Sequence, residues 1–296
     1  VEDKIGPSIN CKMAEIALGV NNSASITPAD VFQSGSDNCG TVQPVSVSPN
    51  TFNCSNVNRP NTVLFLATDG HGNSSACSAS VIVRDLTPPA VTCKDHTVFL
   101  SAAGTASVAP SDVFQSGSDN CGTVNPASVL PNSFNCAHVG PQTVTLTAND
   151  GNGNSVTCTA TVTVRDNIPP SVFCKSATLD LGANGTATLS LYSVFSSATD
   201  NCGPATPISV YPESFDCSHI GPQTVYLLAQ DNNGNSAQCS ASVIVRDATP
   251  PALICKNVTV TLSASGTGTI SASDVFQSGS DNCNTVNPPF LSSSSF

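Results

Sequence analysis

Tryptophan is absent from the 296-residue sequence, and aromatic residues make up only 5% of it. Charged residues are also scarce, at 10%. Only nine residues are Lys or Arg, which leaves a formal net charge of −11 at pH 7. Binding to phosphate backbones requires clustered Lys and Arg, so this composition argues against nucleic acid as a partner. It argues equally against binding to anionic membranes, and it favours cations.

Long apolar runs are missing as well. No segment approaches the roughly 20 apolar residues of a membrane-spanning helix, so we expect no membrane insertion of residues 1–296. The first residues, VEDKIGPSIN, lack the basic-then-apolar pattern of a signal peptide. We therefore expect a mature protein or a piece of a longer one.

Cysteine, by contrast, is abundant, with 14 residues. A chain with so few large apolar side chains buries little apolar area per residue and needs other supports. Disulfide bonds persist in oxidising compartments, so the cysteine content predicts an extracellular or cell-surface protein. Zinc ligation is disfavoured, because neither CxxC spacing nor a repeated set of His partners accompanies the cysteines.

The cysteines reveal an internal repeat. The first cysteine of each unit stands at position 11, 93, 174 or 255, and the phrase DVFQSGSDNC recurs at 30–39, 112–121 and 274–283, with a looser copy at 193–202. Val and Phe persist in all four copies, which predicts a core anchor. This period suits one small β domain per repeat. We expect repeats at 1–85, 86–166 and 167–247 and an incomplete fourth at 248–296, as part of a longer array; the alternative is that another subunit completes the fourth.

Each repeat has the pattern of a β-sandwich. Residues 142–150 and 155–166 alternate apolar and polar side chains, as half-buried strands do, and the intervening DGNGN suits a hairpin turn. Shorter β-type runs precede them, and no useful helical period occurs. The sequence thus predicts an all-β fold of tandem immunoglobulin-like β-sandwich domains. Paired prolines at 88–89, 169–170 and 250–251 fix φ at the joints and predict stiff linkers and a rod-like array.

Three motifs together resemble the hyalin-repeat (HYR) domain family. They are TPP before the first cysteine, ATDGHGN or ANDGNGN before the fourth, and a closing V-x-V-R-D. The resemblance extends over the whole chain and implies an immunoglobulin-like fold and an extracellular, adhesive or matrix role without catalysis. Four cysteines per repeat depart from the simple two-cysteine form, which leaves the loop structure open.

Four cysteines allow three connectivities, of which we favour the nested one, with two disulfides in each repeat. The first and fourth cysteines then tie the ends of the domain, and the second and third close a short loop. The predicted bonds are Cys11–Cys77, Cys39–Cys54, Cys93–Cys158, Cys121–Cys136, Cys174–Cys239 and Cys202–Cys217, with the partners of Cys255 and Cys283 outside the chain.

Aspartates also recur at fixed positions: at the hairpin turn, at the end of each repeat and before the second cysteine. The turn offers oxygens at alternate positions, as calcium loops do, although a bidentate Glu is missing. The other interpretation is Asx turns and strand-end caps satisfied by backbone N–H groups. No cofactor is required in that case. The candidate Ca²⁺ ligands are Asp69, Asp150, Asp231, Asp85, Asp166 and Asp247.

Sequons for N-glycosylation occur at different places in different repeats, at about the frequency that chance gives. These candidate glycan sites are Asn21, Asn53, Asn73, Asn184 and Asn257.

The sequence contains no G-x-S-x-G, H-E-x-x-H or phosphate-cradling glycine loop, so we expect no enzyme. The leading hypothesis is a structural protein, a disulfide-stapled rod in an extracellular stalk, adhesin or fibre, whose partners are neighbouring repeats or identical chains. A second is a multivalent adhesion module that binds glycans or matrix proteins. A third is an accessory array of a larger secreted enzyme.

Overall fold

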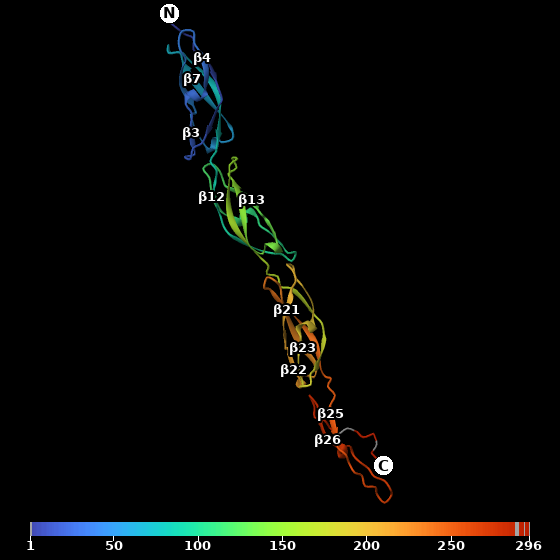
Figure 1. Ribbon diagram of the computed structural model, residues 1–296. Helices are drawn as coiled ribbons and strands as arrows, with labels where there is room; N and C mark the ends of the chain where they lie inside the picture. Colours follow the sequence, from blue (N-terminus) through green and yellow to red (C-terminus); the bar gives the residue numbers. More distant parts are fainter. Residues whose placement is uncertain (1, 288–289, 293, 296) are drawn as a thin grey trace. The chain divides into compact units, whose positions relative to one another are not determined.

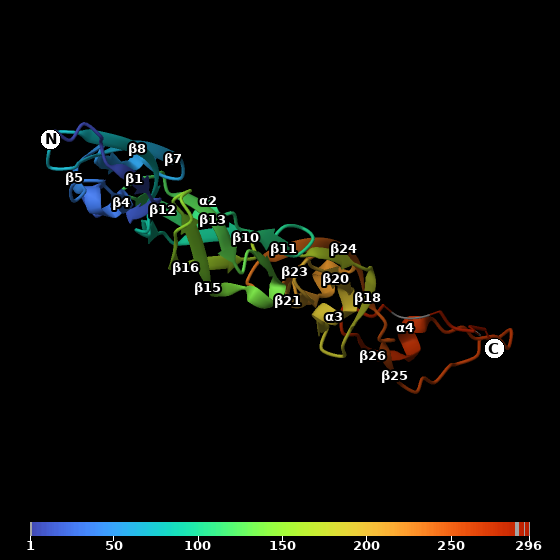
Figure 2. The same cartoon turned by 90° about the horizontal axis from the view of Figure 1, so that it is seen from above.

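The computed structural model describes residues 2–287, 290–292 and 294–295. They form two compact units: unit 1 comprises Val1–Leu100 and Thr105–Arg165, and unit 2 comprises Ser101–Gly104 and Asp166–Phe296. Strands dominate both units, and the helices are single turns (Figures 1 and 2). The chain is therefore all-β, as the alternating sequence pattern predicts. No helix among the described residues is long and apolar enough to cross a membrane.

Eight strands form the first sandwich of unit 1. They are β1 (Ser8–Cys11), β2 (Ala14–Ala17), β3 (Ser23–Ser25), β4 (Phe32–Ser36), β5 (Gln43–Ser48), β6 (Thr51–Asn53), β7 (Pro60–Thr68) and β8 (Ser74–Arg84), with α1 (Pro28–Val31) and the 3-10 turn η1 (Cys54–Asn56). One sheet has the order β2-β8-β7-β5, with β2 parallel to β8 and the other pairs antiparallel. Strand β1 pairs with β4, and β3 pairs with β6.

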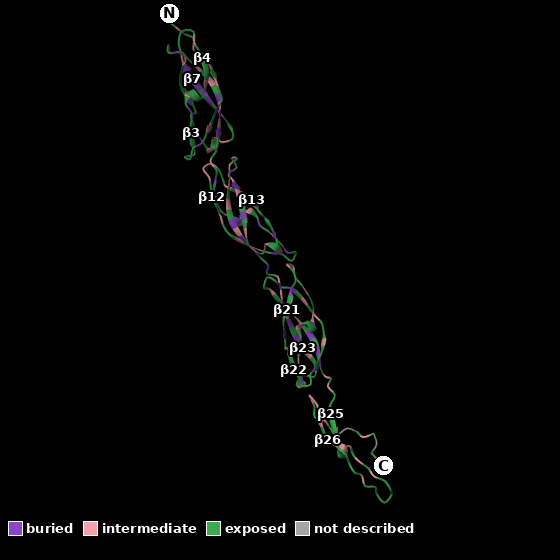
Figure 3. Cartoon of the chain, viewed as in Figure 1, coloured by how far each residue is buried: buried purple, intermediate pink, exposed green. Residues whose placement is uncertain are grey.

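Alternation along the β7–β8 hairpin supplies the core. Phe65 of β7 and Val81 and Val83 of β8 have no exposed surface, whereas their neighbours along the strands are partly or fully exposed. Figure 3 colours the chain by burial. Val31 of α1 is equally buried and belongs to the same cluster, and Phe32 stacks on Phe65 with ring centroids 5.5 Å apart. Each such side chain contributes about 1.5–3 kcal/mol on burial. The Val–Phe pair of the repeated phrase is thus the core anchor that the sequence predicts.

The same arrangement recurs twice along the chain. The second set is β9 (Ala90–Cys93), β10 (His96–Phe99), β11 (Thr105–Ser107), α2 (Pro110–Val113), β12 (Phe114–Ser118), β13 (Asn125–Leu130), β14 (Ser133–Asn135), η2 (Cys136–His138), β15 (Gly140–Asn149) and β16 (Ser155–Arg165). Its four-stranded sheet has the order β10-β16-β15-β13. In this sheet the antiparallel strands β16, β15 and β13 lie beside one parallel edge strand, β10.

Unit 2 contains the third sandwich and part of a fourth. The third comprises β17 (Ser171–Cys174), β18 (Ala177–Leu181), β19 (Thr186–Thr188), α3 (Leu191–Val194), β20 (Phe195–Thr199), β21 (Thr206–Tyr211), β22 (Ser214–Asp216), η3 (Cys217–His219), β23 (Gly221–Gln230) and β24 (Ser236–Asp247). The order β18-β24-β23-β21 repeats the first sheet. In the fourth repeat, α4 (Ala272–Val275) precedes β26 (Phe276–Ser280), which pairs with β25 (Ala252–Cys255).

Candidate functional site at the joints between repeats

One disulfide closes each of the three complete sandwiches. These bonds are Cys11–Cys77, Cys93–Cys158 and Cys174–Cys239, the outer pairs that the sequence predicts. Each joins the first strand of a repeat, in a two-stranded sheet, to the last strand, in the four-stranded sheet. The two layers are therefore tied covalently. Chain entropy assigns a bond across a loop of this length about 4 kcal/mol of stabilisation.

The second set of disulfides overturns the nested prediction. Cys54 bonds to Cys121, and Cys217 bonds to Cys283, so each bond links neighbouring repeats. The predicted pairs Cys39–Cys54, Cys121–Cys136 and Cys202–Cys217 are wrong, and Cys283 has its partner inside the chain. Cys136 and Cys202 are also disulfide-bonded. Cys39 and Cys255 are free and exposed.

The short sequence distance between the second and third cysteines suggested the wrong pairing, because the two cysteines lie at opposite ends of a sandwich. Gly40, next to Cys39, abuts the carbonyl of Asp69 at the hairpin tip. Val57, just after Cys54, bridges to Val83 at the far end of the hairpin. Strand β7 has nine residues, which at about 3.4 Å per residue separates the two ends by roughly 30 Å. A disulfide needs Cα atoms within about 7 Å.

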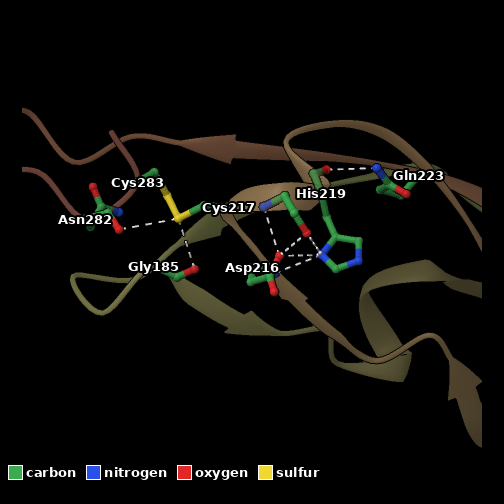
Figure 4. Close-up of polar contacts among 8 residues, drawn as sticks. Gly185, Asp216, Cys217, His219, Gln223, Asn282 and Cys283 are labelled. Atoms are coloured by element: carbon green, nitrogen blue, oxygen red, sulfur yellow. Dashed lines mark hydrogen bonds and ion pairs between the residues drawn. A yellow bond between two sulfur atoms is a disulfide. The ribbon is translucent and has the colours of Figure 1, made fainter. Parts of the chain in front are cut away.

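Figure 4 shows the Cys217–Cys283 bond and its surroundings. Sγ of Cys217 lies 3.4 Å from the carbonyl oxygen of Asn282 and 3.5 Å from that of Gly185. Gly185 has a φ of +72°, and a Cβ there would lie 2.7 Å from the Asn282 carbonyl oxygen. The Asn282 side chain donates from Nδ2 to the carbonyl of Gly182 at 3.0 Å. Glycine at 185 thus permits the close approach of the two repeats at this bond.

A capped 3-10 turn presents the third cysteine of the repeat. In η3, Asp216 Oδ1 accepts from the Ser218 N–H at 2.9 Å. His219 Nδ1 accepts from the Asp216 N–H at 3.2 Å (Figure 4). In η1, Asn56 Oδ1 takes the place of the imidazole and accepts from the Asn53 N–H at 3.0 Å. The first repeat has Asn at this position and the next two have His, because either side chain can accept that backbone hydrogen bond.

Three carboxylates converge beside the Cys54–Cys121 bond. Asp85 follows β8, Asp119 precedes Cys121, and Asp150 starts the turn between β15 and β16. One oxygen of each lies within 4.8 Å of the others. Asp85 and Asp150 are each only 3% exposed. In the part of the chain that the structure describes, no Lys or Arg forms a salt bridge with any of the three.

Asparagines and backbone N–H groups orient two of the three carboxylates. Asp150 Oδ1 accepts from the N–H groups of Asn152 at 2.7 Å and Asn154 at 3.1 Å, and its Oδ2 accepts from Asn154 Nδ2 at 2.6 Å. Asp85 accepts from the side-chain amides of Asn120 and Asn152, each at 3.2 Å. Burial raises the pKa of Asp150, but its hydrogen bonds outweigh burial and hold the pKa below the usual value. Asp150 is therefore ionised at neutral pH.

The third carboxylate has an oxygen without a donor. Asp119 Oδ2 accepts from the Cys121 N–H at 2.9 Å, but Asp119 Oδ1 and the neighbouring Asn120 Oδ1 are buried and lack hydrogen-bond partners among the described residues. Leaving buried acceptors unpaired costs about 1–3 kcal/mol each. Carboxylate and amide oxygens are the ligands that Ca²⁺ prefers. The residues therefore fit a bound calcium ion.

The cluster recurs in unit 2. Asp166, Asp200 and Asp231 each place one oxygen within 4.8 Å of the others, and Asp200 Oδ1 is again buried without a hydrogen-bond partner among the described residues. The Asn233 side chain donates to Asp166 Oδ2 at 2.9 Å, as Asn152 does to Asp85.

The first and fourth repeats carry only parts of the cluster. In the first repeat, Asp3, Asp69 and His71 form a comparable group. Burial raises the pKa of Asp69, but hydrogen bonds from Asn73 and the His71 N–H outweigh it, so the pKa lies below its usual value. At the joint between the third and fourth repeats, Asp247 belongs to no such group among the described residues.

The aspartates that lie together in the structure differ in part from the candidate Ca²⁺ ligands predicted from the sequence. Each hairpin aspartate meets the aspartate that closes the preceding repeat, so Asp150 lies with Asp85 and Asp231 with Asp166. The added members, Asp119 and Asp200, were not selected from the sequence. Their recurrence directly before Asn-Cys was the available signal.

The sequon asparagines lie in different surroundings. Asn73 is partly buried, and its Nδ2 donates to Asp69 Oδ2 at 2.6 Å and to the Asp3 carbonyl at 3.1 Å. Asn53 caps η1 through its side-chain oxygen. The side chains of Asn21, Asn184 and Asn257 belong to exposed residues. A glycan on Asn73 would compete with the contacts of the aspartate group, whereas the three exposed sites lack this conflict.

Sandwiches joined by disulfides and aspartate clusters define a class of protein, a tandem array of covalently connected immunoglobulin-like repeats. The family model for the HYR domain matches residues 84–164 and 165–245, more than half of the sequence. The chain belongs to the HYR domain family.

Two curated relatives have the name hyalin. The one from Strongylocentrotus purpuratus is 30% identical over 203 residues, and the one from Lytechinus variegatus is 29% identical over 215 residues. The alignments cover 66% and 70% of this chain but only 17% and 40% of the relatives. The chain thus spans less than half the length of either hyalin.

Solved structures with similar folds include two immunoglobulin arrays. The titin I-band fragment I67–I69 has a TM-score of 0.38 and 11% identity, covering 82% of this chain and 100% of that chain. Sidekick-1 immunoglobulin domains 1–5 have a TM-score of 0.36 and 13% identity, covering 83% of this chain and 60% of that chain. The fold assignment rests on the strand order and pairing described above.

Proposed function

We propose that this chain is a non-catalytic structural segment of an extracellular protein, in which covalent bonds between repeats maintain a stiff rod. One observation carries the proposal: the third cysteine of one repeat bonds to the second cysteine of the next, in Cys54–Cys121 and Cys217–Cys283. Such bonds persist in oxidising compartments, which supports an extracellular location.

The short joints support stiffness as well. Only residues 85–89 separate β8 from β9, and two of them are Pro88 and Pro89. Proline fixes φ, so the linker has little conformational freedom of its own. The disulfide adds a second connection across the same joint. The partners of such a segment are neighbouring repeats and identical chains in a stalk or fibre.

Electron microscopy of the negatively stained protein tests this function. We expect uniform rods in the oxidised protein and bent or shortened particles after reduction with dithiothreitol. The variant Cys39→Ser removes a free thiol and leaves the Cys54–Cys121 and Cys217–Cys283 bonds in place, so it should leave the rods unchanged. Globular particles or flexible beads under oxidising conditions would contradict the proposal.

Calcium at the aspartate clusters is the second part of the proposal. A Ca²⁺ ion held by Asp85, Asp119 and Asp150 would bring positive charge to carboxyl groups that form no salt bridge among the described residues, and it would fix the joint. An ion bound only by the folded state stabilises it by about 2.7 kcal/mol per site at a concentration of 100 times the Kd. The rod-forming role does not depend on this ion, since the disulfides join the repeats without it.

Thermal melting in Ca²⁺ and in EDTA tests the ion. We expect a higher midpoint in Ca²⁺, and the variant Asp119→Asn should lose part of this increase. The matched control is Asp112→Asn in the same repeat, because Asp112 accepts from the Ala109 N–H at 2.8 Å in the α2 cap, away from the cluster. Identical midpoints in Ca²⁺ and EDTA would remove calcium from the proposal.

A further inference from the structure

The disulfide pattern leaves Cys39 as a second-position cysteine that is free and exposed. Its counterparts Cys121 and Cys283 each bond to the third cysteine of the preceding repeat. Cys202, at the same position of the third repeat, is also disulfide-bonded. The first repeat therefore has the same thiol as the later repeats but no bond on it.

The loop around Cys39 is already folded as it is around its bonded counterpart. The Cys39 N–H donates to Asp37 Oδ2 at 2.9 Å, and Asn38 Nδ2 lies 3.4 Å from Cys39 Sγ. The equivalent contacts of Cys121 measure 2.9 and 3.6 Å. The thiol is thus held in place before any partner bonds to it.

A groove beside the second cysteine borders on the preceding repeat. In the fourth repeat, the groove includes Pro250, Asp281 and Asn282, and Ala183 from the turn of the third repeat also lines it. The matching groove of the first repeat is lined by Ile5, Gly6, Ser8, Ser36, Asp37 and Asn38.

The asparagine of this groove marks the difference between the two repeats. Asn282 Nδ2 donates to the carbonyl of Gly182, in the turn of the preceding repeat, at 3.0 Å. Asn38 Nδ2 makes no such bond to a carbonyl within the described part of the chain; its one contact is with Cys39 Sγ. The groove and the thiol of the first repeat together form a joint surface that lacks its other half.

We propose that this end of the first repeat is a covalent docking surface for the trailing end of another HYR repeat joined ahead of residue 1, whose third cysteine bonds to Cys39. The proposal extends the joint-forming role proposed above. The fitting occupant carries a turn like SAAG at 101–104 or GANG at 182–185, and a cysteine in a segment like SFNC at 133–136 or SFDC at 214–217.

A second copy of this chain does not meet these requirements. Its third-position cysteines, Cys54, Cys136 and Cys217, are all in disulfides. Cys255 is free, but it is a first-position cysteine in β25. The occupant is therefore a repeat whose third cysteine has no other partner.

Formation of the bond removes two protons and two electrons, so an oxidant is needed. A low-molecular-weight disulfide, oxidised glutathione, can act as this oxidant. The Cys39 thiolate attacks it and releases one reduced glutathione, and the thiolate of the partner cysteine then displaces the second. Two protein thiols and one oxidised glutathione give one protein disulfide and two reduced glutathiones.

An extended chain tests the proposal. A copy of residues 83–163 is placed directly ahead of Val1, with the copied Cys121 changed to Ser so that no new second-position thiol is introduced. After oxidation in a glutathione buffer, remaining thiols are labelled with N-ethylmaleimide and the digest is mapped by mass spectrometry. We expect Cys39 to lose its label and to be linked to the copied Cys136. Cys255 should keep its label and serves as the internal control.

Further arms separate the outcomes. The presence of the copied Cys93–Cys158 bond shows that the added repeat has folded. If that bond is missing, a copy of residues 164–244 with Cys202→Ser is used as the added repeat instead. Changing the copied Cys136 to Ser must restore labelling of Cys39. With a folded copy, full labelling of Cys39 or its linkage to a second molecule overturns the proposal. Loss of Cys54–Cys121 from the same digest would instead contradict the proposed joints themselves.

Discussion

Leu146 and Leu130 lie in the same repeat and differ in exposure. Leu146 of β15 is fully buried, whereas Leu130 of β13 is 65% exposed. We predict that Leu146→Ala lowers the free energy of unfolding by about 2–5 kcal/mol, because it leaves a cavity in the core. The matched variant Leu130→Ala should change it by no more than about 0.5 kcal/mol. Urea unfolding measures both, and equal effects would contradict the assigned core.

Asp30 stabilises the start of α1 in a pH-dependent way. Its carboxylate accepts from the Thr27 N–H at 2.7 Å and from the Thr27 hydroxyl at 2.8 Å. The backbone hydrogen bond, followed by the hydroxyl, holds the pKa of Asp30 below its usual value. A lowered pKa in the folded state means that this stabilisation is present above about pH 4 and is lost as the pH falls through the folded-state pKa.

The variant Asp30→Asn tests this linkage. We predict a lower melting temperature than that of the wild type at neutral pH. The difference should begin to shrink as the pH falls below about 4, and it should approach zero only below the folded-state pKa, where the carboxyl of the folded wild type is protonated. Melting curves across this range measure the difference. A difference that stays constant with pH would mean that the carboxylate charge does not contribute.

At the scale of elements, the turn before β19 lies against the inter-repeat bond in unit 2. Gly185 has a φ of +72°, and an added Cβ would lie 2.7 Å from the Asn282 carbonyl oxygen and 2.9 Å from Cys217 Sγ. We predict that Gly185→Ala reduces the fraction of molecules with the Cys217–Cys283 bond. The control Gly266→Ala has a similar φ of +76° but no atom within 4 Å of the added Cβ. Thiol labelling after oxidation measures the bond, and equal labelling of both variants would contradict this role of Gly185.

Much of the element pattern follows from the sequence alone. Period-two alternation predicts strands at 142–150 and 155–166, and the structure has β15 at Gly140–Asn149 and β16 at Ser155–Arg165. The alternation of apolar and polar residues is enough to predict these two strands, because each strand has one face on the core. The inter-repeat disulfides did not follow, since cysteines close in sequence lie at opposite ends of β7. Asp119 was missed for the same reason: its approach to Asp85 and Asp150 exists only at an assembled joint.

At the scale of the whole molecule, the inter-repeat bonds should couple the unfolding of neighbouring sandwiches. The Cys54–Cys121 bond connects the first two repeats across 67 residues of sequence. We predict that the double variant Cys54→Ser/Cys121→Ser broadens or splits the thermal transition of these repeats, because each can then unfold without constraining the other. Calorimetry measures this through the ratio of calorimetric to van't Hoff enthalpy. An unchanged ratio would show that the bond does not couple them.

The Cys54–Cys121 bond also changes what a protease can achieve. A single cut between Arg84 and Ala90 breaks the only peptide connection between the first two sandwiches, yet both fragments stay attached through the sulfur atoms. The nicked protein would run as one species on a gel without reductant and as two with it. Release of a fragment therefore requires two chemically different events, hydrolysis and reduction, at the same joint.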